Sequence, residues 1–268
     1  MGKNTYRQMA DRGMRIVIIG SGNVATHLAL TLSDKCDVVQ IFSRDIRNAL
    51  FLAKQISDSC LATDSAEKLI DADAYIVSIK DDAIKSFLRD MPDSKKNALW
   101  IHTSGSIPRD VFDKSFPQNG VLYPLQTFSK NVDIKMDEVS FFVEGSDKEV
   151  SDKIYSLAKM MSQHIYYADS ELRKKLHIAA VFACNFTNYM YSIANDLLKK
   201  DNIPFSVLIP LIKETTRKAT VTTPDNAQTG PAYRGDTDIV ANHLSILDGE
   251  EKDIYELLSN AILKRYNK

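Results

Sequence analysis

A glycine-rich turn near the N-terminus is the segment of the sequence best suited to chemistry. Residues 20–25 read Gly-Ser-Gly-Asn-Val-Ala between an apolar run and a stretch of helical spacing, so they match G-x-G-x-x-G/A in its strand–turn–helix setting. The first glycine of such a turn permits the tight bend, and the second lets backbone N–H groups approach a phosphate at the helix N-terminus. The alternative is a glycine turn without a ligand. We predict a pyrophosphate site made by Gly20, Ser21, Gly22, Asn23 and Val24.

The next strand-like run, 37–42, ends in Ser43, Arg44 and Asp45, where the ribose of a bound adenosine would lie. An acidic residue at that point favours NAD, whereas an arginine can accept the 2′-phosphate of NADP. Because Ser43 and Arg44 come first, we predict that they bind NADP, with NAD as the alternative cofactor. A solvated Arg44 and an Asp45 that caps the following helix are the other interpretation, and a capping Asp45 is compatible with either.

Polar residues also follow three further strand-like runs. Ser78 and Lys80 follow the first, His102 and Ser104 the second, and the segment 123–127 the third. Ligands in open α/β sheets bind beyond the carboxyl ends of the strands. We therefore predict that Ser78 and Lys80 contact the cofactor and that His102 and Ser104 are catalytic. A solvated or capping side chain is the alternative for each of them.

Two residues of the C-terminal part complete the predicted catalytic set. His177 lies on a long helical stretch, and an imidazole, with a reference pKa of about 6.5, can supply a proton near neutral pH. A core histidine bonded to a backbone carbonyl is the alternative. Arg234 lies in a polar loop before Asp236 and could clamp a substrate carboxylate through two parallel bonds, or be an ordinary surface arginine. Cys184, among alanine and phenylalanine, is predicted to be a buried structural thiol.

The elements that must position these residues change in kind along the chain. Before residue 168, short β-branched runs alternate with helical stretches, which predicts βαβ units and a parallel sheet. Strands are expected at 15–19, 37–42, 74–78, 98–102 and 120–123, with weaker ones near 139–143 and 164–167. Helices are expected at about 23–33, 46–57, 64–71, 81–90 and 148–161.

After Asp169 the apolar residues recur only at helical spacing. Helices are expected at 170–200, 204–220, 236–247 and 250–265, with an irregular loop at 224–231. The predicted fold is α/β: a Rossmann doubly wound, mainly parallel sheet in residues 14–168, followed by an all-α domain in residues 169–268. Residues 1–13 are interpreted as a tail. The substrate cleft is expected between the two domains, where the second can exclude water.

Composition and charge exclude several classes of partner. The 268 residues carry 34 basic and 35 acidic side chains, and this net charge of −1 offers no general field for polyanions, so neither nucleic acid nor a membrane surface is expected. The longest apolar run, 178–184, is far shorter than the roughly 20 residues that span a bilayer. The three cysteines and five histidines show no paired spacing for a metal or a redox site. We expect a cytoplasmic protein without a metal.

Five segments taken together resemble one family: 19–25, 101–106, 123–128, 177–188 and 229–236. They are similar to Rossmann-like NAD(P)-binding proteins with a C-terminal helical domain of unknown function. Those proteins are relatives of pyrroline-5-carboxylate reductase and of the 6-phosphogluconate dehydrogenase superfamily. The resemblance covers nearly all of residues 14–268 and implies a deazaflavin-linked NADP oxidoreductase-like protein, whose helical domain forms a homodimer. The long helix, apolar on several faces, favours the same assembly.

Two positions depart from the patterns of these relatives. Related β-hydroxyacid dehydrogenases carry a catalytic lysine four residues before an asparagine on the long helix, and aligning that asparagine with Asn185 places Val181 at the lysine position. His177, one turn earlier, is the candidate replacement. Tyr123 stands where the similar segment of prephenate dehydrogenases has a histidine.

Two functions follow from these features. The first is an NADP-dependent oxidoreductase that moves a hydride between nicotinamide C4 and the C=O or C=N bond of a small, carboxylated metabolite. The alternative, motivated by the missing lysine, is a non-catalytic NADP-binding sensor or dimeric scaffold. A metal-dependent enzyme is a third interpretation, disfavoured by the spacing of the histidines.

Overall fold

The computed structural model describes residues 13–266, so the tail predicted for residues 1–13 lies, except for Gly13, outside the described residues. The chain forms two compact units, with the division between Cys184 and Asn185. The boundary predicted near residue 168 falls between the last strand and the helix that follows it. That helix therefore belongs to the first unit.

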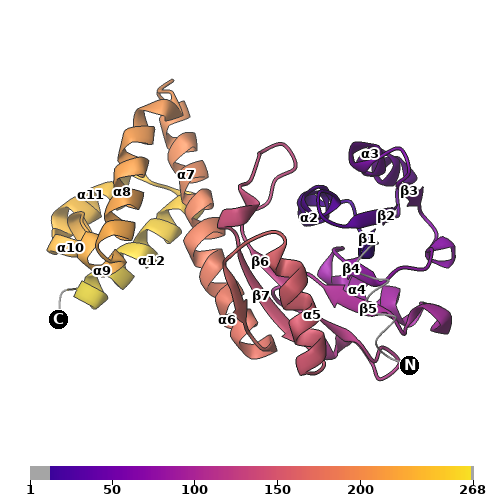
Figure 1. Ribbon diagram of the computed structural model, residues 1–268. Coiled ribbons are helices and arrows are strands. Elements are labelled where there is room, and N and C mark those ends of the chain that lie inside the picture. The colour runs from indigo at the N-terminus through magenta and orange to yellow at the C-terminus, as the bar shows by residue number, and fades with distance from the viewer. Residues whose placement is uncertain (1–12, 267–268) are drawn as a thin grey trace. The chain divides into compact units, whose positions relative to one another are not determined.

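Within residues 13–184, eight strands form one sheet (Figure 1). They are β1 (Arg15–Ile19), β2 (Asp37–Phe42), β3 (Leu61–Thr63), β4 (Ala74–Val77), β5 (Leu99–His102), β6 (Asn119–Leu125), β7 (Ser140–Gly145) and β8 (Ile165–Tyr167). The strand order is β3-β2-β1-β4-β5-β6-β7-β8, and only β6 and β7 pair in the antiparallel sense. The first six strands have the order of a doubly wound dinucleotide-binding sheet. The predicted fold class is confirmed.

The alternation of side chains explains why both faces of this sheet are covered. Along β1, Ile16 and Ile18 belong to one buried apolar cluster, whereas Val17 and Ile19 belong to the other. Such a strand, apolar at its last four positions, is typical of a parallel sheet between two layers of helices. The first cluster also takes residues from α2 (Asn23–Ser33), α3 (Ile46–Ile56) and α5 (Lys148–Lys159), and the second from α4 (Asp81–Arg89).

The prediction of a helix at 64–71 is wrong. Only a 3₁₀ turn, Ala66–Lys68, forms there, and the residues before it make β3. The amide of Gln40 explains the difference. Its nitrogen donates to the carbonyl of Lys68 at 3.1 Å, and its oxygen accepts from the N–H of Ile70 at 3.0 Å. A buried side chain thereby satisfies backbone groups that a helix would otherwise pair.

Helix α6 (Ser170–Ala180) begins at Asp169, whose carboxylate accepts from the N–H of Leu172 at 2.8 Å. A π-helical segment, Val181–Phe186, follows it, so the predicted long helix contains a wider turn. Cys184 lies in this segment and is exposed, which corrects the prediction of a buried thiol.

The described part of the second unit, residues 185–266, contains helices and no strand. Its longer helices are α7 (Thr187–Lys199), α8 (Ile209–Val221), α11 (Thr237–Ile246) and α12 (Gly249–Tyr266). The loop predicted at 224–231 instead contains the short helix α9 (Pro224–Ala227) and leads into α10 (Pro231–Arg234). Each of these helices begins with a proline, which is suited to a first helical position because it lacks the N–H that would be unpaired there.

Candidate functional site

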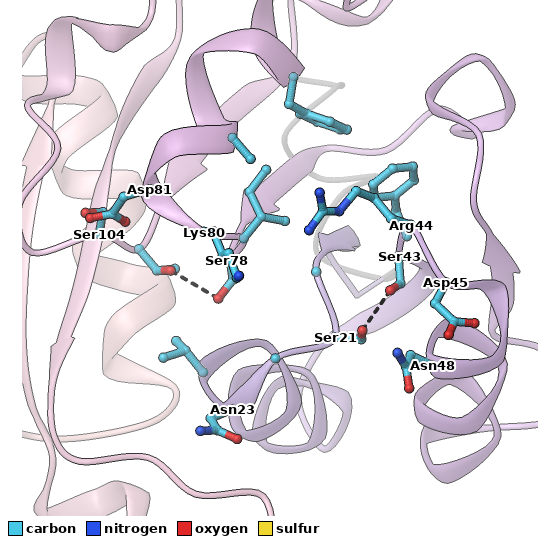
Figure 2. A pocket seen from close by; sticks show the side chains of 18 of the residues that line it. Ser21, Asn23, Ser43, Arg44, Asp45, Asn48, Ser78, Lys80, Asp81 and Ser104 are labelled. Atoms are coloured by element: carbon cyan, nitrogen blue, oxygen red, sulfur yellow. Dashed lines mark hydrogen bonds between the residues drawn. The ribbon is translucent and has the colours of Figure 1, made fainter.

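A cavity of about 810 Å³ lies at the carboxyl ends of β1, β2, β4 and β5 (Figure 2). This volume is within the range of roughly 300–1,000 Å³ for cofactor pockets. All nine residues predicted to contact a cofactor line it, namely Gly20, Ser21, Gly22, Asn23, Val24, Ser43, Arg44, Ser78 and Lys80. Ser104, predicted as catalytic, lines it as well.

The two glycines of the turn differ in what surrounds them. Gly20 has a φ of +125°, and a Cβ there would lie 2.1 Å from the carbonyl oxygen of Ser78. A Cβ on Gly22 would meet no atom within 4 Å, because this residue faces open space at the start of α2. Position 20 therefore needs a glycine, because its φ and the nearby carbonyl oxygen exclude a side chain. Gly22 instead leaves room for an anion beside the helix N-terminus.

The two charged residues that follow β2, Arg44 and Asp45, differ in whether their side chains have a partner. Asp45 caps α3, and it also accepts two hydrogen bonds from the Arg47 guanidinium at 3.0 and 2.6 Å, which lower the pKa of this carboxyl. Arg44 makes no hydrogen bond or ion pair with any described residue, and Figure 2 shows its guanidinium directed into the cavity. Ser43 accepts a hydrogen bond from the Ser21 hydroxyl at 2.8 Å. A 2′-phosphate would therefore meet a free cation and two hydroxyls.

Hydroxyl groups line the far end of the cavity, beyond β4 and β5. Thr103 donates to the Ser78 hydroxyl at 3.1 Å. The Ser104 oxygen accepts from the N–H groups of Ser106 and Ile107 at 3.1 and 3.0 Å, which fixes the loop after β5. The hydroxyl hydrogen of Ser104 is not used by either of these bonds.

His102, predicted as catalytic, is fully buried and does not line the cavity. Its ring stacks on Phe112 at 5.7 Å, and its Nδ1 accepts from the N–H of Ser104 at 3.2 Å. Burial, assisted by the positive charge of Arg173, lowers the pKa of His102 to about 3. The imidazole is accordingly neutral at physiological pH. It is linked to the cavity only indirectly, through its hydrogen bond with Ser104.

His177, also predicted as catalytic, projects from α6 toward the same loop without lining the cavity. Its Nδ1 lies 3.0 Å from the Tyr123 hydroxyl oxygen. A Cβ on Gly105 would lie 2.8 Å from this Nδ1 and from the tyrosine ring. The two side chains thus pack directly on the residue after Ser104.

A buried ion pair holds α6 against this loop. Arg173, 1% exposed, donates to Glu144 of β7 at 2.5 Å and to the carbonyl of Ile107 at 2.7 Å. The hydroxyl of Ser170, in the first turn of α6, accepts from the N–H of Arg109 at 3.0 Å. His177 lies one helical turn after Arg173, on the helix that these contacts hold in place.

Arg234 belongs to the second unit, where its guanidinium pairs with Asp236 at 2.7 Å. Asp236 occupies the N-cap position of α11 without a side-chain capping bond, because its carboxylate faces Arg234.

Sequence reasoning missed several residues that border the cavity, among them Thr103, Asn48 and Lys130. Lys130 comes from the loop after β6, which His27 of α2 contacts through a hydrogen bond of 2.9 Å to the carbonyl of Ser129. Tyr123 was noted as a polar strand end and as a departure from the prephenate dehydrogenase pattern, and its proximity to His177 had no signal in the sequence.

Two kinds of feature are absent from the described residues, a metal-binding cluster and a membrane-spanning helix. No group of three or more His, Cys, Asp or Glu side chains in this part of the chain could hold a metal ion. No helix among residues 13–266 combines the length and the apolar character required to cross a membrane.

Comparisons with known proteins place the chain in a family. Residues 15–104 match a family described as NADP oxidoreductase coenzyme F420-dependent, and residues 139–262 match a domain of unknown function (DUF2520). A solved protein of Bacteroides fragilis, provisionally assigned as an NADP oxidoreductase, is 41% identical, with a TM-score of 0.86 over 94% of this chain and 98% of its own. The chain belongs to this NADP oxidoreductase family. NADP is therefore the cofactor of the oxidoreductase, as predicted.

More distant structures share the fold of the oxidoreductase. A Thermotoga maritima protein is 22% identical, with a TM-score of 0.74 over 93% of this chain and 96% of its own. A reductive aminase of Aspergillus terreus, solved with NADPH and ethyl-5-oxohexanoate, is 12% identical, with a TM-score of 0.70 over 94% of each chain. No curated protein matches the sequence significantly.

The residues of the cavity fit NADP. Gly22 leaves the space that a pyrophosphate needs, and the free guanidinium of Arg44 suits a 2′-phosphate. The hydroxyls of Ser78, Thr103 and Ser104 lie at the end of the cavity where the nicotinamide half would extend.

Proposed function

We propose that the protein transfers a hydride between NADP(H) and the C=O or C=N bond of a small, carboxylated metabolite. The observation that carries the proposal is a single cavity in which the glycine turn leads to a row of hydroxyls at Ser78, Thr103 and Ser104. The cofactor supplies the hydride, and the protein supplies orientation and protons. The reductive aminase that shares the fold was solved with NADPH and a keto ester, which is a reason to test C=O and C=N compounds together.

The proposed roles of the predicted catalytic residues follow from their surroundings. Ser104 contacts the reacting end of the cavity, and His102 positions it through the 3.2 Å hydrogen bond to its N–H. His177 is proposed to act in proton transfer. Arg234 is proposed to bind the substrate carboxylate, which would have to replace Asp236 as the partner of the guanidinium.

We also propose that the protein is a homodimer through its helical unit. Among residues 185–266, only Ala232 and Ser259 are less than a tenth exposed. Large apolar side chains are exposed to solvent on several helices, including Leu211 (64% exposed), Ile246 (81%) and Leu257 (70%). Exposed apolar surface of this extent is typical of an interaction face.

Single-turnover oxidation of bound NADPH tests the function. The probes are pyruvate, pyruvate with methylamine, α-ketoglutarate and 2-methyl-1-pyrroline, which present keto acids, an imine formed in solution and a cyclic imine. We expect at least one of them to oxidise the bound cofactor. A protein that binds NADPH tightly and reduces none of them would instead support the non-catalytic sensor or scaffold.

A further inference from the structure

Tyr123 and His177 form a pair beside the loop after β5, whose residue Ser104 lines the cofactor cavity. Val121 of β6 lies beside His102 of β5, so Tyr123, two residues further on, is level with Ser104 just past the end of β5. Gly105 connects the pair to the cavity, because a Cβ there would lie 2.8 Å from both aromatic rings. The phenol and the imidazole therefore pack against Gly105, the chain neighbour of Ser104, whose side chain lines the cavity.

The two members of the pair differ in their access to solvent. Tyr123 is 7% exposed, and burial raises its pKa to about 12, so the phenol keeps its proton at physiological pH. The positive charge of Arg173 acts in the opposite direction and favours the phenolate. His177 is only half-buried, so its imidazole can exchange protons with water.

We propose that Tyr123 is the proton donor of the reduction and that His177 positions it and returns its proton from solvent. This inference rests on the proposed function. It assigns the reacting proton to a residue outside the catalytic set predicted from the sequence.

The same step serves a carbonyl and an imine. The hydride of NADPH forms a C–H bond, and the electron pair of the C=O or C=N bond moves to oxygen or nitrogen. That atom takes the proton of the Tyr123 hydroxyl, which leaves NADP⁺ and a phenolate. The phenolate then takes the Nδ1 hydrogen of His177 while Nε2 gains a proton from solvent. Before the next turnover, Nε2 releases a proton to water and Nδ1 takes one back, which restores the starting tautomer. The reverse sequence serves oxidation.

The arrangement requires a particular tautomer of His177. If Tyr123 donated to Nδ1, its hydrogen would be occupied and unavailable to a substrate. Nδ1 must therefore carry the hydrogen and donate it to the tyrosine oxygen across the 3.0 Å contact. This requirement can be measured without any substrate.

Nitrogen NMR of protein labelled with ¹⁵N-histidine in the presence of NADPH provides that measurement. The sequence has five histidines, and the signals of His177 are assigned by their loss in His177→Asn. We expect Nδ1 to be protonated in the neutral ring and its signal to shift in Tyr123→Phe. An Nε2–H tautomer, with Nδ1 as the acceptor, would overturn the proposal.

Kinetics with the panel of keto acids and imines give the second measurement. Tyr123→Phe keeps the ring and removes the proton, so we expect single-turnover NADPH oxidation to fall at least about a hundredfold while NADPH affinity is retained. Tyr166→Phe is the matched control, since Tyr166 lies on β8 and is 49% exposed, whereas Tyr123 is buried against His177. It should react like the wild type.

His177→Asn separates positioning from proton return. An asparagine amide can still donate to the tyrosine oxygen but cannot relay a proton, so the first turnover should stay within about threefold, whereas steady-state turnover should fall at least about tenfold. Unchanged steady-state turnover in this variant, or an equally active Tyr123→Phe, would overturn this proposal alone. A wild-type protein that binds NADPH and reduces nothing would overturn the proposed function as well.

Discussion

Gly20 packs against Ser78 so closely that a Cβ at position 20 would lie 2.1 Å from the Ser78 carbonyl oxygen. The turn after β1 and the loop after β4 therefore approach each other at a position that admits no side chain. Gly22, two residues later, faces open space. The two glycines of one motif thus predict opposite outcomes on substitution.

Gly22→Leu should keep the stability of the protein and abolish NADP binding, because the leucine would occupy the space for the pyrophosphate. Gly20→Ala should instead lower the free energy of unfolding by about 1–3 kcal/mol or more, since a residue with a Cβ is forced into an unfavourable φ against a backbone oxygen. Thermal unfolding and cofactor titration of both variants provide the measurement. A Gly22→Leu protein that is folded and binds NADP normally would contradict the assignment of the turn.

Arg44→Ala should weaken NADP binding by about ten- to a hundredfold and leave NAD nearly unchanged. A hydrogen bond to a charged group contributes roughly 1.5–3 kcal/mol, and only NADP carries the 2′-phosphate. Arg47→Ala is the control, because Arg47 pairs with Asp45 and does not line the cavity. Titration of both cofactors against both variants decides the matter, and equal losses for NAD and NADP in Arg44→Ala would refute the role.

His102 should make stability depend on pH. Its pKa is about 3 in the folded protein and about 6.5 when unfolded, so the unfolded state binds more protons between these values. The contribution of the neutral ring is fully present above pH 6.5 and is lost as the pH falls below it. Between pH 7 and pH 5, the wild type should lose about 2 kcal/mol relative to His102→Gln. Urea unfolding of both proteins at the two pH values measures this difference, and parallel losses would show that His102 titrates normally.

The exposed apolar residues of the helical unit predict a dimer that a charge can weaken. Light scattering at micromolar concentration should give twice the chain mass of 30.1 kDa. Leu257→Glu, on an exposed position of α12, should shift the mass toward one chain, whereas Lys252→Glu, an exposed polar position on the same helix, should not. A monomeric wild type would contradict the proposed assembly.

The sequence predicted those features that depend on local pattern. The bounds expected for β1 and β2 match the structure, because their apolar runs end at a glycine turn and at the polar Ser43. That the cofactor residues would line one cavity was predictable, because the carboxyl ends of parallel strands meet at one edge of the sheet. The segment after β3 was not, because its conformation depends on the Gln40 side chain from another strand.

Contacts between distant residues account for what was missed at the site. Tyr123 and His177 are 54 positions apart, and neither the spacing nor the residue types indicate that they touch. His102 is likewise stacked on Phe112, and the positive charge of Arg173 helps to lower its pKa, and no local pattern reveals either neighbour. A histidine at a strand end gives the same sequence pattern whether it is a catalytic residue or a buried structural residue.

The buried pair of Arg173 and Glu144 has a consequence for how the protein can change over generations. Losing one partner of such a pair leaves an uncompensated charge and costs about 3–5 kcal/mol, whereas replacing both with apolar residues can be nearly neutral. Positions 144 and 173 are therefore expected to covary among descendants, by paired replacement and seldom by single steps. Because Arg173 lies one turn before His177, a lineage that exchanges the pair would also have to find another way of holding that histidine beside Tyr123.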